Sequence, residues 1–169
     1  MAVYTLRPNG AGDLTELGTQ FPASGAHWDK VDEATADDDT TYVEDTTNAG
    51  VRLRDLYTLE NLSIGSGTIT EVRIFTRTKS STALAPIYSH RALIKTNGTI
   101  YESGGIYKGL TYVDFYDYWT TNPFTGSAWT IAEVNALQAG IAMSGQVGAP
   151  ARCTHLYVNV TVTTPAMVI

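Results

Sequence analysis

The residues best suited to chemistry form an acidic stretch between Asp29 and Asp45. This stretch carries eight carboxylates against one basic residue, Lys30. Oxygen donors at this density are the ligands that a hard cation such as Ca²⁺ requires, and Asp32, Asp37 and Asp39 are the candidate ligands. The spacing is not that of an EF-hand loop, and runs of carboxylates also form solvated loops in which an aspartate caps a turn. A calcium site and a structural surface loop therefore both stay open, and no other cofactor is expected.

Aromatic residues gather between positions 107 and 124. In a strand over residues 110–119, alternation would place Tyr112, Tyr116 and Tyr118 on one face, and Phe115 and Trp119 on the other. A tyrosine ring combines apolar area with a polar tip, which suits contacts that stay partly wet. The three tyrosines are therefore candidate binding residues for a sugar stacked on the rings or for a neighbouring protein subunit. The purely structural alternative is that these tyrosines cover a sheet edge or lie under a loop.

No motif in the sequence indicates catalysis. The chain has neither the Gly-x-Ser-x-Gly turn of a hydrolase nor a glycine-rich phosphate loop. His27, His90 and His155 lack the spacing of metal ligands. Cys153 precedes His155 by two residues in a predicted strand, so the two would share a face without meeting as nucleophile and base. Two carboxylates could still converge in the fold, but their spacing selects no pair. We therefore expect a protein that is not an enzyme.

Alternation of apolar and polar residues with a period of two predicts the strands that position these side chains. Over residues 68–79, the inward positions are Thr70, Val72, Ile74, Thr76 and Thr78. Over residues 152–163, the inward positions are Leu156, Val158, Val160 and Val162, and the outward ones are Cys153, His155, Tyr157, Asn159 and Thr161. Further strands are expected at 3–7, 40–43, 51–59, 87–96, 99–102, 110–119 and in part of 140–143, with a hairpin turn at Asn97-Gly98.

One short helix is expected after Thr130. Thr130 and Glu133 match a capping box, and the helix would run for about two turns, until Gly140. Short strands, one helical segment and frequent Gly and Pro predict an all-β fold, a jelly-roll β-sandwich in which two stacked sheets bury alternate residues. A length of 169 residues with 43% hydrophobic composition fits a single β-sandwich domain over residues 1–169.

Composition argues against some classes of binding partner and predicts where the protein is made. The net charge of −6 and the isoelectric point near 4.9 argue against nucleic-acid binding through bulk charge. Uncharged apolar stretches are too short to span a bilayer, so no membrane association is expected. No signal peptide is visible at the N-terminus, which predicts synthesis in the cytoplasm of the producing cell. The single cysteine excludes an intrachain disulfide.

Two parts of the chain resemble known groups of β-sandwich proteins. Residues 32–77 contain Asp39-Thr40-Thr41-Tyr42-Val43 after the acidic stretch, and they resemble the opening half of galactose-binding-like jelly rolls. That resemblance implies a β-sandwich, with calcium near this turn and sugars at the loops in some members. Residues 122–140 read NPFTGSAWTIAEVNALQAG and resemble a block in β-sandwich proteins that are often encoded among phage and provirus structural genes. Residues 5–10 and 154–158 resemble the start and end of that second group, which implies no catalytic residues.

These features together favour a non-catalytic virion structural protein, made in the host cytoplasm and located in the virion. It would be a jelly-roll subunit that decorates a capsid or belongs to a tail, and that self-associates as a homo-oligomer or docks on neighbouring virion subunits. The apolar C-terminal residues 161–169 suit such docking. The alternative is a carbohydrate-binding module that attaches to a host or polysaccharide glycan through the tyrosines and the acidic stretch.

Overall fold

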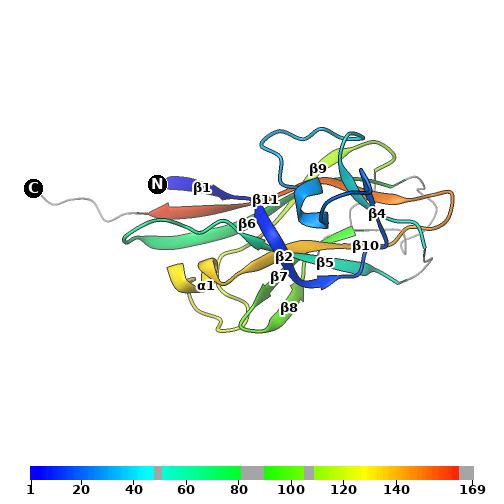
Figure 1. Ribbon diagram of the computed structural model, residues 1–169. Coiled ribbons are helices and arrows are strands. Elements are labelled where there is room, and N and C mark those ends of the chain that lie inside the picture. Colours follow the sequence, from blue (N-terminus) through cyan, green and yellow to red (C-terminus); the bar gives the residue numbers. More distant parts are fainter. Residues whose placement is uncertain (48–50, 81–89, 105–108, 164–169) are drawn as a thin grey trace, which may run out of the picture.

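The strands of the protein form two antiparallel sheets that face each other in a computed structural model, which describes residues 1–47, 51–80, 90–104 and 109–163 (Figure 1). Sheet A comprises β1 (Ala2–Leu6), β3 (Thr19–Phe21), β4 (Tyr42–Asp45), β6 (Thr68–Ser80), β9 (Val113–Trp119) and β11 (Ala151–Thr163). Sheet B comprises β2 (Pro8–Thr15), β5 (Leu53–Leu59), β7 (His90–Thr96), β8 (Thr99–Glu102) and β10 (Gln138–Met143). The helical segments of the described ranges are a 3-10 helix, η1 (His27–Lys30), and a short α-helix, α1 (Ile131–Asn135).

Strand β11 pairs with three other strands of sheet A, namely β1, β4 and β6. The order of this sheet is β3-β4-β11-β6-β9, and β1 also pairs with β11, along its C-terminal half, while β4 pairs with its N-terminal end. Sheet B has the order β2-β5-β10-β7-β8. This arrangement of two antiparallel layers confirms the predicted all-β jelly-roll sandwich with one short helix. In the described ranges, no helix is long and apolar enough to cross a membrane.

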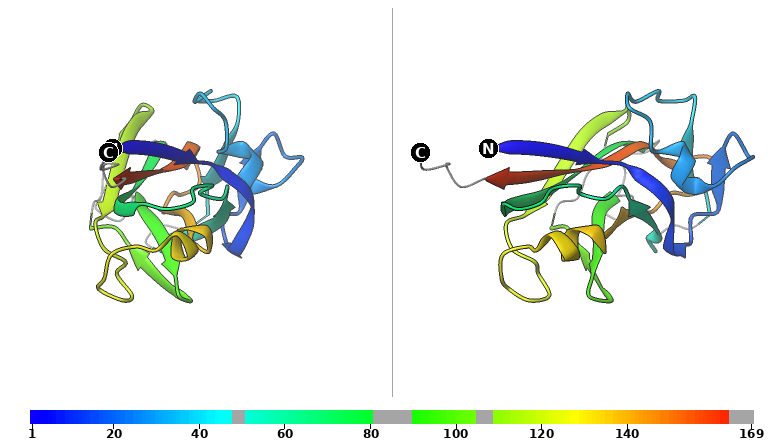
Figure 2. Two further views of the ribbon diagram at one scale, coloured as in Figure 1. Left: turned by 90° about the vertical axis from the view of Figure 1, so that its left-hand side faces the viewer. Right: turned by 60° about the vertical axis from the view of Figure 1, so that its left-hand side comes forward.

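The hydrophobic core lies between the inward faces of the two sheets. Sheet A contributes valine and isoleucine side chains of β6 and β11, and sheet B contributes Tyr57, Ile94 and Ile141. Trp129 is buried in the same cluster, and its indole Nε1 donates to the carbonyl oxygen of Trp119 at 3.2 Å. Figure 2 shows α1 at the end of the sandwich where β1 begins. The block at 122–140 therefore supports one end of the core.

Two register shifts between neighbouring strands make the observed burial of side chains differ from the predicted alternation. The ladder between β11 and β6 shifts between Cys153 and His155, and again between Thr161 and Val162. An extra residue in one strand moves the following side chains to the other face. As a result Cys153 is fully buried in the core although alternation predicted it outward, and Ile69 takes the inward place that was predicted for Thr70. The other predicted inward residues of both strands are confirmed.

The predicted capping box is confirmed, but the helix is shorter than expected. Thr130 Oγ1 accepts the Glu133 backbone N–H at 3.1 Å, and the Glu133 carboxylate accepts the Thr130 backbone N–H at 2.8 Å. The helix ends at Asn135 because the chain enters β10 at Gln138. Gly140 belongs to that strand, and a Cβ added to it would lie 1.9 Å from the Asp55 carbonyl oxygen. This glycine therefore permits close approach between strands and does not end a helix.

The other predicted elements are present with displaced ends. Asn97 and Gly98 form the expected hairpin turn with φ angles of 50° and 79°. Strands β2 and β3 are not predicted, because Pro8–Thr15 carries glycines and small polar residues and Thr19–Phe21 is very short. Of the strand expected at 87–96, the first three residues lie outside the described part of the chain. So do residues 164–169 of the apolar C-terminal segment.

Candidate ligand-binding site

The outward face of sheet A carries a row of three aromatic side chains. Tyr157 of β11 stands opposite Phe75 of β6, and Phe75 stands opposite Tyr116 of β9. The Phe75 ring stacks on Tyr157 with centroids 4.7 Å apart and planes 9° apart, and its centroid lies 5.7 Å from that of Tyr116. Directly opposed residues of neighbouring strands are the closest side-chain pairs in a sheet. Strand pairing therefore builds a continuous aromatic strip across three strands.

Polar rows flank this aromatic strip on both sides. One row consists of His155, Arg77 and Asp114, and the other of Asn159, Arg73 and Tyr118. The Arg73 guanidinium lies over the rings of Tyr116 and Tyr118, 4.7 and 5.4 Å from their centroids, within the range of cation–π attraction. Arg77 Nη1 lies 3.3 Å from an Asp114 carboxylate oxygen. Hydrogen-bonding groups thus border an apolar strip on each side.

An open groove follows the β11 and β6 members of the three rows, and Tyr116 and Tyr118 of β9 stand beside it without lining it. Adjoining cavities of 420, 310 and 250 Å³ follow the outward face of the sheet. The first two share Phe75, and the second and third share His155 and Tyr157, so the cavities lie next to one another. Residues Val3 and Thr5 of β1 line one part of the groove, and residues 34–36 line another. The acidic stretch therefore supplies part of a groove wall.

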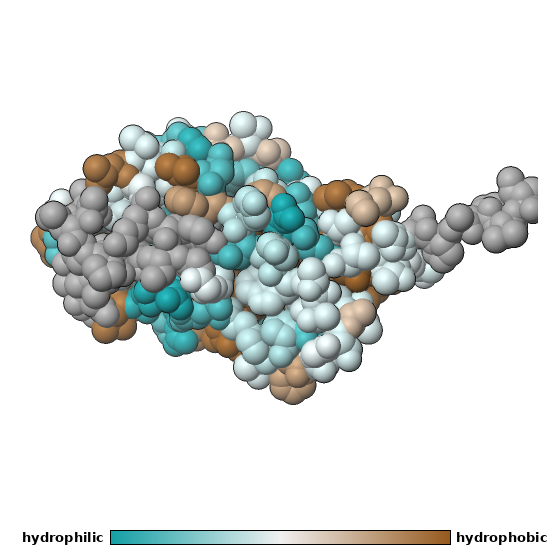
Figure 3. Space-filling view, turned by 180° about the vertical axis from the view of Figure 1, so that it is seen from behind, coloured by the Kyte–Doolittle hydropathy of each residue, from teal (hydrophilic) through white to brown (hydrophobic). Residues whose placement is uncertain are grey.

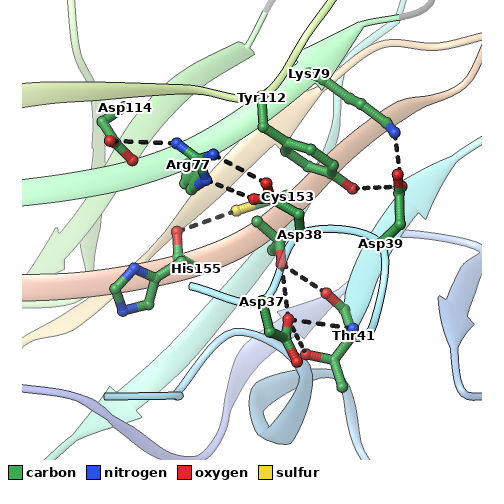
Figure 4. Close-up of polar contacts among 11 residues, drawn as sticks. Asp37, Asp38, Asp39, Thr41, Arg77, Lys79, Tyr112, Asp114, Cys153 and His155 are labelled. Carbon is green, nitrogen blue, oxygen red and sulfur yellow. Dashed lines mark hydrogen bonds and ion pairs between the residues drawn. The ribbon is translucent and has the colours of Figure 1, made fainter. Parts of the chain in front are cut away.

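Ion pairs hold the acidic stretch against sheet A (Figure 4). Asp38 accepts two hydrogen bonds from Arg77, at 2.5 and 3.0 Å, and this guanidinium lowers the pKa of the Asp38 carboxyl. Asp39 contacts Lys79 Nζ at 2.6 Å and Arg152 Nη1 at 3.0 Å, and the hydrogen bond from Lys79 is the main cause of its lowered pKa. The charges of Asp38 and Asp39 are therefore neutralised by cations of β6 and β11.

The three carboxylates proposed as calcium ligands have separate surroundings. Asp37 Oδ1 accepts hydrogen bonds from the backbone N–H and the hydroxyl of Thr41, at 3.2 and 2.9 Å, as a turn-capping aspartate does. Asp39 is engaged by the cations described above, and burial raises the pKa of Asp32. Among the residues that the structure describes, no group of three or more His, Cys, Asp or Glu is arranged to hold a metal ion. The calcium hypothesis therefore gains no support here and stays a prediction.

The structure places two of the three predicted tyrosines on the outward face of sheet A, beside the groove. Tyr116 and Tyr118 are 53% and 55% exposed on the outer side of β9. Tyr112 precedes the strand, is half-buried, and donates its hydroxyl to Asp39 at 3.1 Å, so it braces the acidic stretch. Its pKa is raised, mainly by burial. Sequence reasoning missed Phe75 and Tyr157 as site residues, although both occupy outward positions of the two most clearly predicted strands.

Cys153 and His155 are not arranged for nucleophilic chemistry. Cys153 is buried in the core, and this burial raises the pKa of its thiol to about 12. His155 Nε2 donates to the Glu33 carbonyl oxygen at 2.8 Å, and burial lowers the pKa of the imidazole. The thiol is therefore protonated at neutral pH and inaccessible, while the histidine lines the groove as an uncharged polar group.

The surface on the side opposite to Figure 1 has no continuous apolar patch among its coloured residues. Figure 3 shows hydrophobic side chains there in small separate groups among hydrophilic ones. Large apolar docking surfaces on soluble proteins are usually contiguous.

The fold of the protein is similar to the folds of solved structures with low sequence identity. No protein-family model matches the chain, and no curated protein matches it significantly. A solved structure titled "Family 16 Carbohydrate Binding Module-2" matches with 8% identity and a TM-score of 0.43, covering 74% of this chain and 77% of that one. One titled "CBM4 structure and function" matches with 11% identity and a TM-score of 0.38, covering 73% and 80%. The N-terminal cellulose-binding domain of Cellulomonas fimi β-1,4-glucanase C matches with 13% identity and a TM-score of 0.40, covering 91% and 99%. Similarities this distant do not establish a shared function.

Proposed function

We propose that the protein is a non-catalytic carbohydrate-binding module that holds a glycan in the groove of sheet A. The observation that carries this proposal is the aromatic strip of Tyr157, Phe75 and Tyr116, bordered by polar rows on both sides. Apolar rings receive the flat faces of sugar rings, and the flanking groups receive the hydroxyls at their edges. Binding sites commonly combine aromatic walls with a few placed polar groups in this way.

The dimensions of the strip suit a chain of sugars. Two interstrand spacings separate β11 from β9, which corresponds to about 10 Å across the sheet. The groove continues past the strip toward β1, where Asn159 and Val3 line it. A ligand that follows the groove would therefore contact more than one aromatic ring.

The charge distribution of the groove favours a neutral ligand. Arg73 Nε lies 2.8 Å from a Glu71 carboxylate oxygen, and Arg77 is held by Asp38 and Asp114. Because these two guanidinium groups are already paired within the protein, they offer little free positive charge for a phosphate or an acidic peptide. Arg7, which lines another part of the groove, forms no ion pair with a described residue, so a single positive charge is available there. The net charge of −6 also disfavours nucleic acid. Polyhydroxylated neutral chains remain the best match.

The test measures glycan binding to the full chain on an array of neutral polysaccharides, followed by calorimetric titration with the best soluble oligosaccharide. Tyr116→Ala and Tyr157→Ala should each weaken binding at least tenfold, equivalent to about 1.4 kcal/mol. Phe124→Ala is the matched control, because this exposed aromatic lies on a loop and belongs neither to the aromatic strip nor to the lining of the groove. An array without any bound glycan, or equal affinities for all three variants, would refute the proposal.

A virion location and contacts with virion subunits stay predictions. A particle subunit can itself carry a glycan site, so the two roles are compatible. Negative-stain images of the purified protein, or its presence in isolated particles, would decide the assembly role independently of glycan binding.

A further inference from the structure

Arg7 brings to the groove a positive charge that the described part of the protein does not pair. It directly follows β1 and lines the 250 Å³ cavity that Tyr157 and Asn159 also line. Its guanidinium forms no ion pair with a described residue, and the buried Nε has no hydrogen-bond partner. Arg73 and Arg77, by contrast, are held by carboxylates. Arg7 is therefore the arginine of the groove that can pair with an anionic ligand.

The main chain of Arg7 is anchored although its guanidinium is unpaired. Its N–H donates to Glu60 Oε2 at 3.0 Å, and its carbonyl oxygen accepts the Glu60 N–H at 2.9 Å. The preceding residue, Leu6, is buried in the core and pairs with Val158 of β11. The Glu60 carboxylate thus engages the backbone of Arg7 and not its side chain. A side chain on an anchored main chain has less freedom to lose when a ligand binds.

Uncharged donors stand beside Arg7 in the same cavity. Thr5 of β1 lies opposite Asn159 of β11 and donates its hydroxyl to Asn159 Oδ1 at 2.8 Å. This bond leaves the Asn159 Nδ2 group as a donor for a ligand, and the Tyr157 hydroxyl can donate as well. None of the described residues that line this cavity is Asp or Glu. An anionic oxygen would therefore meet donors there and no carboxylate.

The charges around this cavity suit one anionic group. His155 lines the cavity and stays neutral, because burial lowers the pKa of its imidazole and the nearby charge of Arg7 lowers it further. Asp114 lies against Arg77, and Asp32 forms no ion pair with Arg7. Arg7 is thus the charged residue among those described in the lining of this cavity. One charge pairs with one anion and does not attract a series of them.

The position of the cavity connects Arg7 with the aromatic strip. Tyr157 belongs to both, and Asn159 also lines the adjoining 420 Å³ cavity. A sugar stacked on the strip can therefore direct a substituent of its ring toward Arg7. The planar guanidinium presents a fork of N–H donors that matches a carboxylate through two parallel hydrogen bonds. Uronic acids are the sugars that carry such a carboxylate.

We infer that the groove recognises a glycan with a neutral chain and a single uronic acid, whose carboxylate pairs with Arg7 beside Tyr157 and Asn159. This inference rests on the proposed glycan binding and specifies its substrate class. A chain with an acid on every sugar is disfavoured, because Arg73 and Arg77 are already paired with carboxylates of the protein.

The experiment compares native and carboxyl-reduced forms of the same polysaccharides, so that the charge is removed and the sugar chain is kept. Glucuronoxylan and xanthan carry uronic acids at intervals on neutral backbones, whereas polygalacturonate carries one on every sugar. In affinity electrophoresis, native glucuronoxylan or xanthan should retain the full chain more strongly than its reduced form, and native polygalacturonate should not. Oligosaccharides of the preferred pair should differ at least tenfold in affinity by calorimetry. That difference should shrink when the salt concentration rises from about 0.05 M to about 0.5 M.

Three variants test whether Arg7 causes this preference. Arg7→Gln should bring the affinities for the acidic and the reduced oligosaccharide together. Asn159→Asp keeps the shape of the side chain and adds a negative charge to the cavity, so it should also remove the preference, and it serves if Arg7→Gln does not fold. Arg91→Gln is the matched control, because Arg91 is also a partly buried arginine with an unpartnered Nε and does not line the groove. It should keep the preference of the wild type.

The outcomes separate this inference from the proposed function. Equal affinities for the native and reduced forms would overturn the inference and leave glycan binding in the groove intact. A preference retained in Arg7→Gln would also overturn it, because the acid would then contact another residue. Retention by sulfated carrageenan without a preference in any uronic acid pair would show a sulfate site instead. Absence of binding to every form would refute the groove as a glycan site and the inference with it.

Discussion

His90 provides a quantitative test of the core because it is a fully buried imidazole. Its Nε2 lies 2.6 Å from the Thr78 hydroxyl, and its Nδ1 has no hydrogen-bond partner in the described part of the chain. Burial lowers the pKa of His90 from 6.5 to about 4. The unfolded chain therefore takes up a proton at this residue at a higher pH than the folded chain does. The contribution of the neutral imidazole to stability is complete above pH 6.5 and is lost as the pH falls from 6.5 to 4.

The size of this effect follows from the shift in pKa. Each unit of difference between folded and unfolded states corresponds to about 1.36 kcal/mol, so the shift of His90 corresponds to about 3 kcal/mol. Urea unfolding of the wild type and of His90→Gln at a series of pH values between 7.5 and 4 measures it. The glutamine amide can bond with Thr78 but does not titrate, so the free energy of unfolding of the variant should fall by about 3 kcal/mol less over this range.

The comparison between variant and wild type cancels the contributions to the free energy of unfolding from the other groups that titrate in the same pH range. These include His155, whose pKa is lowered by burial, and Glu33, whose pKa is raised by burial. Parallel pH dependences for the two proteins would refute the reasoning. NMR titration of the His90 imidazole in the folded wild type gives an independent check, since a pKa near 6.5 would contradict the effect of burial.

Two further predictions concern the acidic stretch and the thiol. Asp38→Asn weakens the two-point contact with Arg77, so amide hydrogen exchange over residues 33–41 should accelerate. The free energy of unfolding should change by less than about 1 kcal/mol, because the pair is partly exposed. Unchanged exchange over these residues would show that another contact anchors the loop. Cys153 is buried with a thiol pKa raised to about 12, so it should not react with a thiol reagent at pH 8 until urea unfolds the chain, and rapid labelling of the native protein would contradict its inward placement.

Alternation in the sequence was sufficient to predict which side of a strand a residue occupies, but not which residues meet. The outward positions of Phe75, Tyr116 and Tyr157 follow from a period of two within each strand. Their contact depends on the order β11-β6-β9 and on register, neither of which a single sequence reveals. The same limit applies to His27 and Asp55, which lie 28 residues apart and meet only because η1 packs beside β2 and β5.

The departures from alternation have local causes. Alternation cannot anticipate a register shift, so Cys153 was expected outward, whereas the extra residue before His155 turns it inward. In the block at 122–140, by contrast, the capping box was predicted correctly, because its hydrogen bonds join residues only three positions apart. Local hydrogen bonds are therefore readable from spacing, while contacts across the sandwich require the pairing of strands.

The two register shifts between β11 and β6 also define the regular part of the outward face of sheet A. Between them, residues from His155 to Thr161 pair with residues from Arg77 to Glu71 without interruption. Only an uninterrupted ladder keeps aromatic and polar residues in straight rows across strands, because a slip of one residue would turn the whole set toward the core. Shifts at both ends confine this regular segment and allow Cys153 and Ile69 to join the core beside it. The shifts that break the simple alternation rule thus separate an aromatic face of fixed register from the ends of the sheet.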